Sequence, residues 1–330
     1  MGNLDYTQVL NKIENTRRFG NEPGVVVTAQ VIKVLREKGK QKRIIPYIHV
    51  AGTNGKGSVC AFFSSILKKG HMRVGTFVSP HLVDFEERIT VDGRMIPKED
   101  VTRLGNYLLD IDFGIGLTMF DYCLAMALLY FEEQQRDYMV IETGLGGRLD
   151  STNAIGTPQC AVITKIGYDH MAILGSDIAD IAAEKAGIIK ENGTVVVEQQ
   201  DKRAMQVIEQ EAQEKHARII TVEQSDIARC SGYALRLCGT FQWENAAAAE
   251  LAVFDYFQFR MDLNARKQRL MKEMGTCLER AKSRLKHDEL TLRFYDPKSQ
   301  LNEKKKRLAD VEDTLLRLIA ERQQETRRDL

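Results

Sequence analysis

The sequence GTNGKGS at residues 52–58 constrains the fold of this chain more than any other segment. Residues 43–51 before it are apolar and partly β-branched, as in a buried parallel strand, and residues 59–69 after it have the apolar spacing of a helix. In a strand–loop–helix unit of this kind, loop N–H groups and the positive end of the helix converge on an anion. The segment therefore predicts a phosphate-binding loop in which Lys56 reaches the β- and γ-phosphates and Ser58 assists with metal or phosphate.

This loop departs from the common phosphate-loop pattern, which has a glycine five residues before the glycine that precedes lysine, and Ser or Thr directly after the lysine. Val50 stands at the first of these positions, and Gly57 separates Lys56 from Ser58. A plain glycine turn between a strand and a helix is the alternative interpretation, and it predicts no ligand.

Strand and helix patterns alternate along the first 250 residues. Short apolar strands are predicted at residues 73–78, 138–142, 159–166, 194–198 and 218–222, and helices at residues 117–131, 178–187 and 202–215. This alternation predicts an α/β fold built on a doubly wound, mostly parallel sheet. Ligands of such sheets bind beyond the carboxyl ends of the strands. The candidate site residues that fall there are Lys56, Ser79, Glu142 and His170.

The composition changes near residue 250. From Ala252 to Leu330 there are 19 Lys or Arg and 14 Asp or Glu residues, a net charge of +5, whereas the preceding 251 residues carry a net charge of −4. We therefore expect two domains, at residues 1–250 and 251–330. Apolar residues repeat at helical spacing from Leu270 to Leu285 and at heptad-like spacing from Leu301 to Leu318, so the extension is predicted to form long charged helices, as a hairpin or a coiled-coil-like pair.

Bulk properties argue against several classes of protein. The net charge of +1 gives no general reason to expect binding to nucleic acid or a membrane. The six cysteines form no CxxC pair, so they indicate neither a zinc site nor a disulfide framework and are typical of buried thiols in a reducing cytosol. No apolar run marks a signal peptide or approaches the roughly 18 residues of a membrane span, and we expect a cytoplasmic protein.

Several motifs occur in a fixed order, and together they carry a family resemblance. HVAGTNGKGS at residues 49–58 resembles the phosphate loop of the Mur ligase superfamily, and the Gly-Ser pair after the lysine resembles its folylpolyglutamate and dihydrofolate synthase branch. The motifs that follow and resemble the same branch are SPHL at 79–82, TMFD at 118–121, ETGLGGRLDSTN at 142–153, AEKAGIIK at 183–190 and GTFQWEN at 239–245. The resemblance covers about residues 3–250.

The resemblance implies a P-loop ligase that uses ATP and Mg²⁺. The nucleotide-binding residues that it implies are Gly52, Thr53, Asn54, Gly55, Lys56, Gly57, Ser58 and Asn245. It implies Ser79, Glu142 and His170 as magnesium ligands, and Thr118 and Phe120 as residues on the folate side. It also implies that Lys185, together with His170, belongs to the catalytic group, with Lys185 as a carbamylated lysine that helps to position magnesium.

Taken without the resemblance, these residue types allow other interpretations. Burying a carboxylate such as Glu142 at the end of a strand costs free energy unless it is paired or metal-bound. Its oxygens suit Mg²⁺. A histidine such as His170 is more often a satisfied loop residue, because imidazole is an unusual partner for Mg²⁺. A lysine such as Lys185 is more often a solvated helix residue. Residues 150–153 either form a polar turn or act directly.

The reaction that the resemblance implies has three steps. ATP phosphorylates a carboxylate of the substrate, the amine of glutamate attacks the acyl phosphate, and an amide and phosphate leave. The acceptor would be a tetrahydrofolate, its polyglutamate or dihydropteroate. Phosphoryl transfer depends mainly on positioning and charge neutralisation, which suits a lysine, backbone amides and magnesium.

The extension does not resemble the smaller C-terminal domain that positions glutamate in such ligases. Residues 247–330 resemble the helical region of the exodeoxyribonuclease VII large subunit, through NARKQRL at 264–270, YDP at 295–297 and LNEKKKRL at 301–308. The chain is then a chimera, and we expect it to retain nucleotide binding better than turnover.

Three other interpretations of the chain stay open. The extension is a generic pair of surface helices, or it binds a helical protein partner or single-stranded DNA beside a nucleotide-binding remnant, with no DNA binding expected of the ATP domain. A ligase for cell-wall precursors is a further alternative, against which Gly57 and the SPHL motif argue.

Overall fold

The computed structural model describes residues 3–17, 20–43, 45–254, 301–314 and 317. Contacts divide the chain into two units, residues 1–259 and 260–330. In the second unit residues 301–314 are helical, and the side chains of Leu301, Leu308 and Val311 are exposed. The remaining parts of the predicted helices lie outside the described residues. The domain boundary near residue 250 and the hairpin or coiled-coil arrangement stay predictions.

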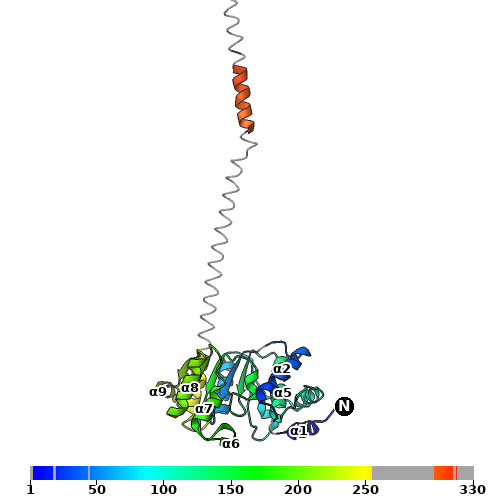
Figure 1. Ribbon diagram of the computed structural model, residues 1–330, viewed down its shortest axis with the longest axis vertical. Helices are drawn as coiled ribbons and strands as arrows, with labels where there is room; N and C mark the ends of the chain where they lie inside the picture. Colours follow the sequence, from blue (N-terminus) through cyan, green and yellow to red (C-terminus); the bar gives the residue numbers. More distant parts are fainter. Residues whose placement is uncertain (1–2, 18–19, 44, 255–300, 315–316, 318–330) are drawn as a thin grey trace, which may run out of the picture. The chain divides into compact units, whose positions relative to one another are not determined.

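An eight-stranded sheet forms the centre of the first unit (Figure 1), with the strand order β4-β3-β2-β5-β1-β6-β7-β8. Six neighbouring strands are parallel: β2 (Val74–Phe77), β5 (Tyr138–Glu142), β1 (Tyr47–Ala51), β6 (Cys160–Ile163), β7 (Thr194–Val197) and β8 (Arg218–Thr221). The short strands β3 (Ile89–Val91) and β4 (Arg94–Met95) add an antiparallel edge. The predicted α/β fold with a mostly parallel sheet is confirmed.

Helices cover both faces of this sheet. The helices are α1 (Tyr6–Glu14), α2 (Gly24–Glu37), α3 (Lys56–Lys69), α4 (Lys98–Leu109), α5 (Met119–Glu133), α6 (Met171–Leu174), α7 (Ile178–Ala186), α8 (Lys202–Glu214) and α9 (Gln224–Cys230). Two 3₁₀ turns, η1 (Phe85–Arg88) and η2 (Ser151–Ala154), lie between them, and residues 242–254 are also helical. In Figure 1, α1, α2 and α5 lie towards one end of the sheet and α7, α8 and α9 towards the other.

The core consists of three clusters, which show how the sheet is covered. Tyr47 packs with residues of α1, α2, α4 and α5, whereas its neighbour Ile48 packs with residues of α3 and with Ala246–Ala249. Successive strand residues point to opposite faces, so β1 is buried on both sides. A third cluster joins β6 and β7 to α7 and α8. The carboxyl ends of β2, β5, β1 and β6 are thus held side by side, where ligands of doubly wound sheets bind.

Among the residues that the structure describes, no helix combines the length and the apolar character that crossing a membrane requires.

Substituting Gly75 tests the packing of α5 against β2. A methyl group at Gly75 would lie 2.5 Å from Cδ1 of Phe131, a fully buried side chain of α5. We expect Gly75→Ala to lower the free energy of unfolding by about 1–3 kcal/mol, because an overfilled core must shift. Urea denaturation measures the change.

Gly116→Ala is the matched control for this substitution. Nothing lies within 4 Å of a methyl group built at Gly116. Its free energy of unfolding should stay within about 0.5 kcal/mol of the native value, as is usual for surface substitutions. Equal stabilities of the two variants would show that α5 does not pack closely on β2.

Candidate active site

The predicted phosphate loop leaves β1 at Ala51 and is fastened to the end of β6. The N–H groups of Thr53 and Asn54 donate to the carbonyl of Lys165, at 2.9 and 3.2 Å. The Thr164 hydroxyl donates to the carbonyl of Asn54 at 2.7 Å. Gly52 has a φ of +155°, and a side chain there would collide with the Thr164 hydroxyl. The first amides of the loop are therefore used within the protein, and N–H groups for an anion must come from residues further along.

Those later N–H groups belong to the start of α3. Gly55 precedes the helix in the left-handed conformation, with a φ of +91°, and no side chain caps the helix. The first turn of an uncapped helix presents unsatisfied N–H groups and positive potential. Lys56, Gly57 and Ser58 form this turn, so these three of the predicted loop residues lie where an anion can be bound.

A buried carboxylate faces the loop from the end of β5. Lys56 Nζ lies 3.8 Å from Oε1 of Glu142, and the N–H of Ser79 donates to its Oε2 at 3.3 Å. Glu142 is only 4% exposed. Burial raises the pKa of Glu142 to about 7, against the opposing charge of Lys56. A carboxylate buried at such cost in free energy, and contacted by the backbone of Ser79, provides hard oxygen ligands that fit Mg²⁺.

Lys185 of α7 reaches the same loop from the other side. Its Nζ donates to the carbonyl of Gly52 at 2.8 Å, and the side chain is buried. Burial and the charge of Lys56 lower the pKa of Lys185 to about 8. About a tenth of its amine is therefore uncharged at pH 7, far more than for an ordinary lysine.

His170 is the least connected of the predicted ligands. It follows β6 in the left-handed conformation, with a φ of +50°. Its ring is about half exposed, and in the described part of the chain its only ion-pair partner is Asp169, at 3.6 Å. The loop that carries His170 is nevertheless fixed to the phosphate loop, because the Thr53 hydroxyl donates to the carbonyl of Gly167 at 3.0 Å. Lys56, Glu142 and Ser79 are brought together, and a role of His170 as a ligand stays a prediction.

The predicted folate-side residues lie at the start of α5, and both have structural partners. Thr118 caps this helix, and its hydroxyl donates to Oδ2 of Asp121 at 2.7 Å. The ring of Phe120 lies 5.5 Å from that of Phe77, edge to face. A side chain at Gly144 would meet the Phe120 ring. The start of α5 is thus placed against the loop after Glu142, and contacts of Thr118 and Phe120 with folate stay predictions.

A buried polar network, only partly predicted from the sequence, connects this loop to β1. Oδ2 of Asp150 accepts the N–H groups of Gly144 and Leu145 at 3.0 and 2.9 Å. Oδ1 of Asp150 accepts the Thr152 hydroxyl at 2.5 Å, and that hydroxyl lies 2.8 Å from Nε2 of His49. Because the hydroxyl donates to Asp150, His49 donates to it from Nε2. The polar turn at residues 150–153 therefore positions the loop that follows Glu142.

A second missed contact involves the helix at residues 242–254. Gln242 Nε2 donates to the hydroxyl of Ser58 at 3.1 Å and Gln242 Oε1 accepts from Asn245 Nδ2 at 2.8 Å. A side chain at Gly55 would collide with Oδ1 of Asn245. Gln242 and Asn245 thus brace the phosphate loop, and a contact of Asn245 with adenine stays a prediction.

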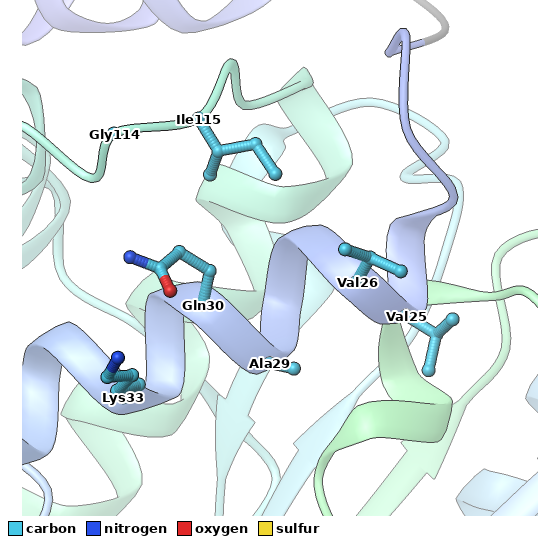
Figure 2. Close-up of a pocket in the computed structure, with 7 residues that line it drawn as sticks. All are labelled: Val25, Val26, Ala29, Gln30, Lys33, Gly114 and Ile115. Atoms are coloured by element: carbon cyan, nitrogen blue, oxygen red, sulfur yellow. The ribbon is translucent and has the colours of Figure 1, made fainter.

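Other residues line an open hollow of about 770 Å³ (Figure 2). Val25, Val26, Ala29, Gln30 and Lys33 line it from one side of α2, and Gly114 and Ile115 from the facing loop. None of its lining residues is among the predicted site residues, so the chemistry is assigned to the loop at the end of β1.

Comparison with known proteins gives a consistent picture. Residues 50–253 match the model of the Mur ligase middle domain. The dihydrofolate synthase/folylpolyglutamate synthase of Bacillus subtilis is 43% identical over 220 residues, which are 64% of this chain and 50% of that protein. The folylpolyglutamate synthase of Mycobacterium tuberculosis, solved with ADP and AMPPCP, superposes with a TM-score of 0.67 at 30% identity, over 77% of this chain and 62% of that one.

A solved FPGS–AMPPCP–folate complex is also similar, with a TM-score of 0.66 and 28% identity, over 77% of this chain and 68% of that one. The chain spans about half the length of the Bacillus relative.

The neutral state of His49 generates a pH prediction. Burial lowers the pKa of His49 to about 3, and the charge of Lys190 acts in the same direction. Below about pH 6.5, His49 therefore binds a proton in the unfolded chain but not in the folded chain. The free energy of unfolding consequently falls as the pH is lowered from about 6.5 towards 3. His49→Gln keeps an N–H donor but does not titrate. The free energy of unfolding of native protein should therefore fall by up to about 1.4 kcal/mol more per pH unit than that of His49→Gln in this range.

Urea denaturation of both proteins at pH 7, 6 and 5 makes the comparison. Parallel declines in the free energy of unfolding would contradict a buried, neutral His49.

Proposed function

The chain belongs to the Mur ligase family through its middle domain, and from this premise we propose that it binds ATP with Mg²⁺ and serves the ATP-dependent addition of glutamate to a folate. The observation that carries the proposal is the convergence of Lys56, Glu142 and Ser79 on the uncapped start of α3. The names of the relatives support the folate, and a bound ATP analogue in the solved relatives supports the nucleotide.

Each side chain has a task that follows from its position. The amides at the start of α3 and the ammonium group of Lys56 would hold the β- and γ-phosphates. Glu142 and Ser79 would hold the magnesium ion, which supplies neutralisation of the charge on the transferred phosphoryl group. Lys185, fixed to the carbonyl of Gly52, would orient this side of the loop. The residues mainly position and neutralise, which is what phosphoryl transfer requires.

The acceptor would approach from the side of α5. Thr118 and Phe120 lie at its first turn, and the Phe120 ring packs against Gly144, two residues after Glu142. A carboxylate of a folate held there would meet the terminal phosphate, and the acyl phosphate would then be attacked by the amine of glutamate. We include His170 as a third magnesium ligand and Asn245 as the adenine contact in the same proposal.

The match covers about half of the length of the Bacillus enzyme. The alternative, a nucleotide-binding remnant whose extension binds a helical protein or DNA, gains no support from these relatives.

We place this activity in the cytoplasm. In the described part of the chain, Cys60, Cys123 and Cys230 are buried thiols outside any disulfide. Buried thiols of this kind are typical of reducing compartments.

Removing the Lys56 ammonium group tests the nucleotide site. Its charge-assisted contact with the phosphates is expected to be worth about 1.5–3 kcal/mol. Lys56→Ala should therefore weaken binding of Mg·ATP by roughly 10- to 100-fold in isothermal titration calorimetry. Lys69→Ala, at the opposite end of the same helix, is the control and should bind like native protein. Equal affinities in all three proteins would remove the basis of the proposed function.

The lowered pKa of Lys185 makes its carbamylation testable. A neutral amine reacts with carbon dioxide, and the pKa of about 8 means that the neutral fraction rises as the pH increases from 7 to 9. Native protein in ¹³C-labelled bicarbonate should show a carbamate signal in NMR that grows over this range. Lys185→Ala should lose this signal, whereas Lys69→Ala should keep it. A signal that persists without Lys185 would assign the carbamate to another amine.

A further inference from the structure

Arg88 is a buried cation close to the candidate magnesium ligands. The proposed function gives Arg88 no role. It ends η1, and its carbonyl accepts the N–H of Val78 at 3.0 Å, which places Arg88 beside the residue that precedes Ser79. Its side chain is directed inwards, since the residue is only 8% exposed.

Within the described residues, the guanidinium group of Arg88 has no negatively charged partner. Its Nε donates to Nδ1 of His81 at 2.8 Å, so the ring proton of His81 lies on Nε2. Among residues 3–17, 20–43, 45–254, 301–314 and 317, no carboxylate lies within 4 Å of the Arg88 guanidinium, and Nη1 and Nη2 make no hydrogen bond. Nη1 and Nη2 are also not among the fully buried side-chain atoms without a partner, so a ligand can reach them.

Arg136 shows how this fold treats another buried arginine. It is 9% exposed, and its Nη1 forms an ion pair with Asp92 at 2.5 Å. Its Nε and Nη2 donate to the carbonyl of Gln134. A buried charge without such compensation is costly. The contrast indicates that Arg88 is available to an anion other than the carboxylates of the described residues.

The charge of Arg88 affects the pKa values of two groups, which indicates where it acts. Burial raises the pKa of Glu142 and the charge of Lys56 opposes this, with a further lowering contribution from Arg88. Burial likewise raises the pKa of Cys123 in α5, and Arg88 opposes it. The guanidinium is therefore close enough to act both on Glu142 at the end of β5 and on Cys123 in α5. Glu142 belongs to the phosphate side of the proposed site and α5 to its folate side.

We propose that Arg88 binds the carboxylate of the acceptor folate and holds it towards the terminal phosphate, an assignment that rests on the proposed function. Nη1 and Nη2 donate to the two carboxylate oxygens, because a guanidinium matches a carboxylate in this two-point geometry. His81 is a positioning residue, since its Nδ1 fixes the orientation of the guanidinium through Nε. No bond to Arg88 forms or breaks.

The test uses the full chain, saturated with Mg²⁺ and a non-hydrolysable ATP analogue. Calorimetry compares the affinity of folic acid with that of folic acid whose γ-carboxylate is converted to the amide. Native protein should prefer the acid about 10- to 100-fold, as expected for charge-assisted hydrogen bonds. In Arg88→Gln this preference should fall to near unity, with nucleotide affinity unchanged. Arg88→Lys should retain an intermediate preference, because lysine keeps the positive charge but lacks the two parallel N–H donors of the guanidinium group.

The ratio of the affinities for the acid and the amide distinguishes a direct contact with the carboxylate from a general loss of structure. A purely structural role of Arg88 would weaken both ligands equally and leave the preference intact, which would overturn the assignment. If Arg88→Gln does not fold, the same comparison in Arg88→Lys decides. Arg73→Gln, which removes an exposed ion pair with Asp137, is the control and should behave like native protein. Nucleotide binding by native protein without any folate binding would overturn the proposed acceptor and this assignment together.

Discussion

The site depends on one costly arrangement, the buried carboxylate of Glu142 facing the ammonium group of Lys56 across 3.8 Å. β5 and β1 are adjacent and parallel, with Val50 opposite Glu142, so the two chain reversals that follow them meet at one point. The interior does not fully neutralise Glu142, since burial raises its pKa to about 7 despite Lys56. A divalent cation would favour the charged form and supply the missing compensation.

The surrounding contacts hold this point in place from several elements. The carbonyl of Lys165 takes up the first amides of the phosphate loop, and Asp150 takes up those of the loop after Glu142. Thr152 links Asp150 to His49, one residue before Val50 in β1. Buried hydrogen bonds of this kind hold a loop firmly, although Nδ1 of His49 has no partner among the described residues. They leave the start of α3 and the Glu142 carboxylate as the groups open to a ligand.

The sequence predicted the parts of the fold that follow from local pattern. An apolar run placed β5 at residues 138–142, its observed bounds. β1 was predicted from residue 43 but begins at Tyr47, because Pro46 has no N–H group for the ladder. β3 and β4, three and two residues long, are too short to show a period. Side-chain pairing across the chain, such as His49 with Thr152 or Arg88 with His81, has no sequence period at all, so the polar network was missed.

The most direct test of the site is the magnesium dependence of nucleotide binding by the full chain, measured by calorimetry with a non-hydrolysable ATP analogue for native protein and Glu142→Gln. We expect native protein to bind the analogue much more tightly with Mg²⁺ than without it, and the amide variant to lose most of this gain while keeping its metal-free affinity. Native binding that is indifferent to Mg²⁺, or a gain that survives in Glu142→Gln, would contradict a magnesium nucleotide held at the end of β5.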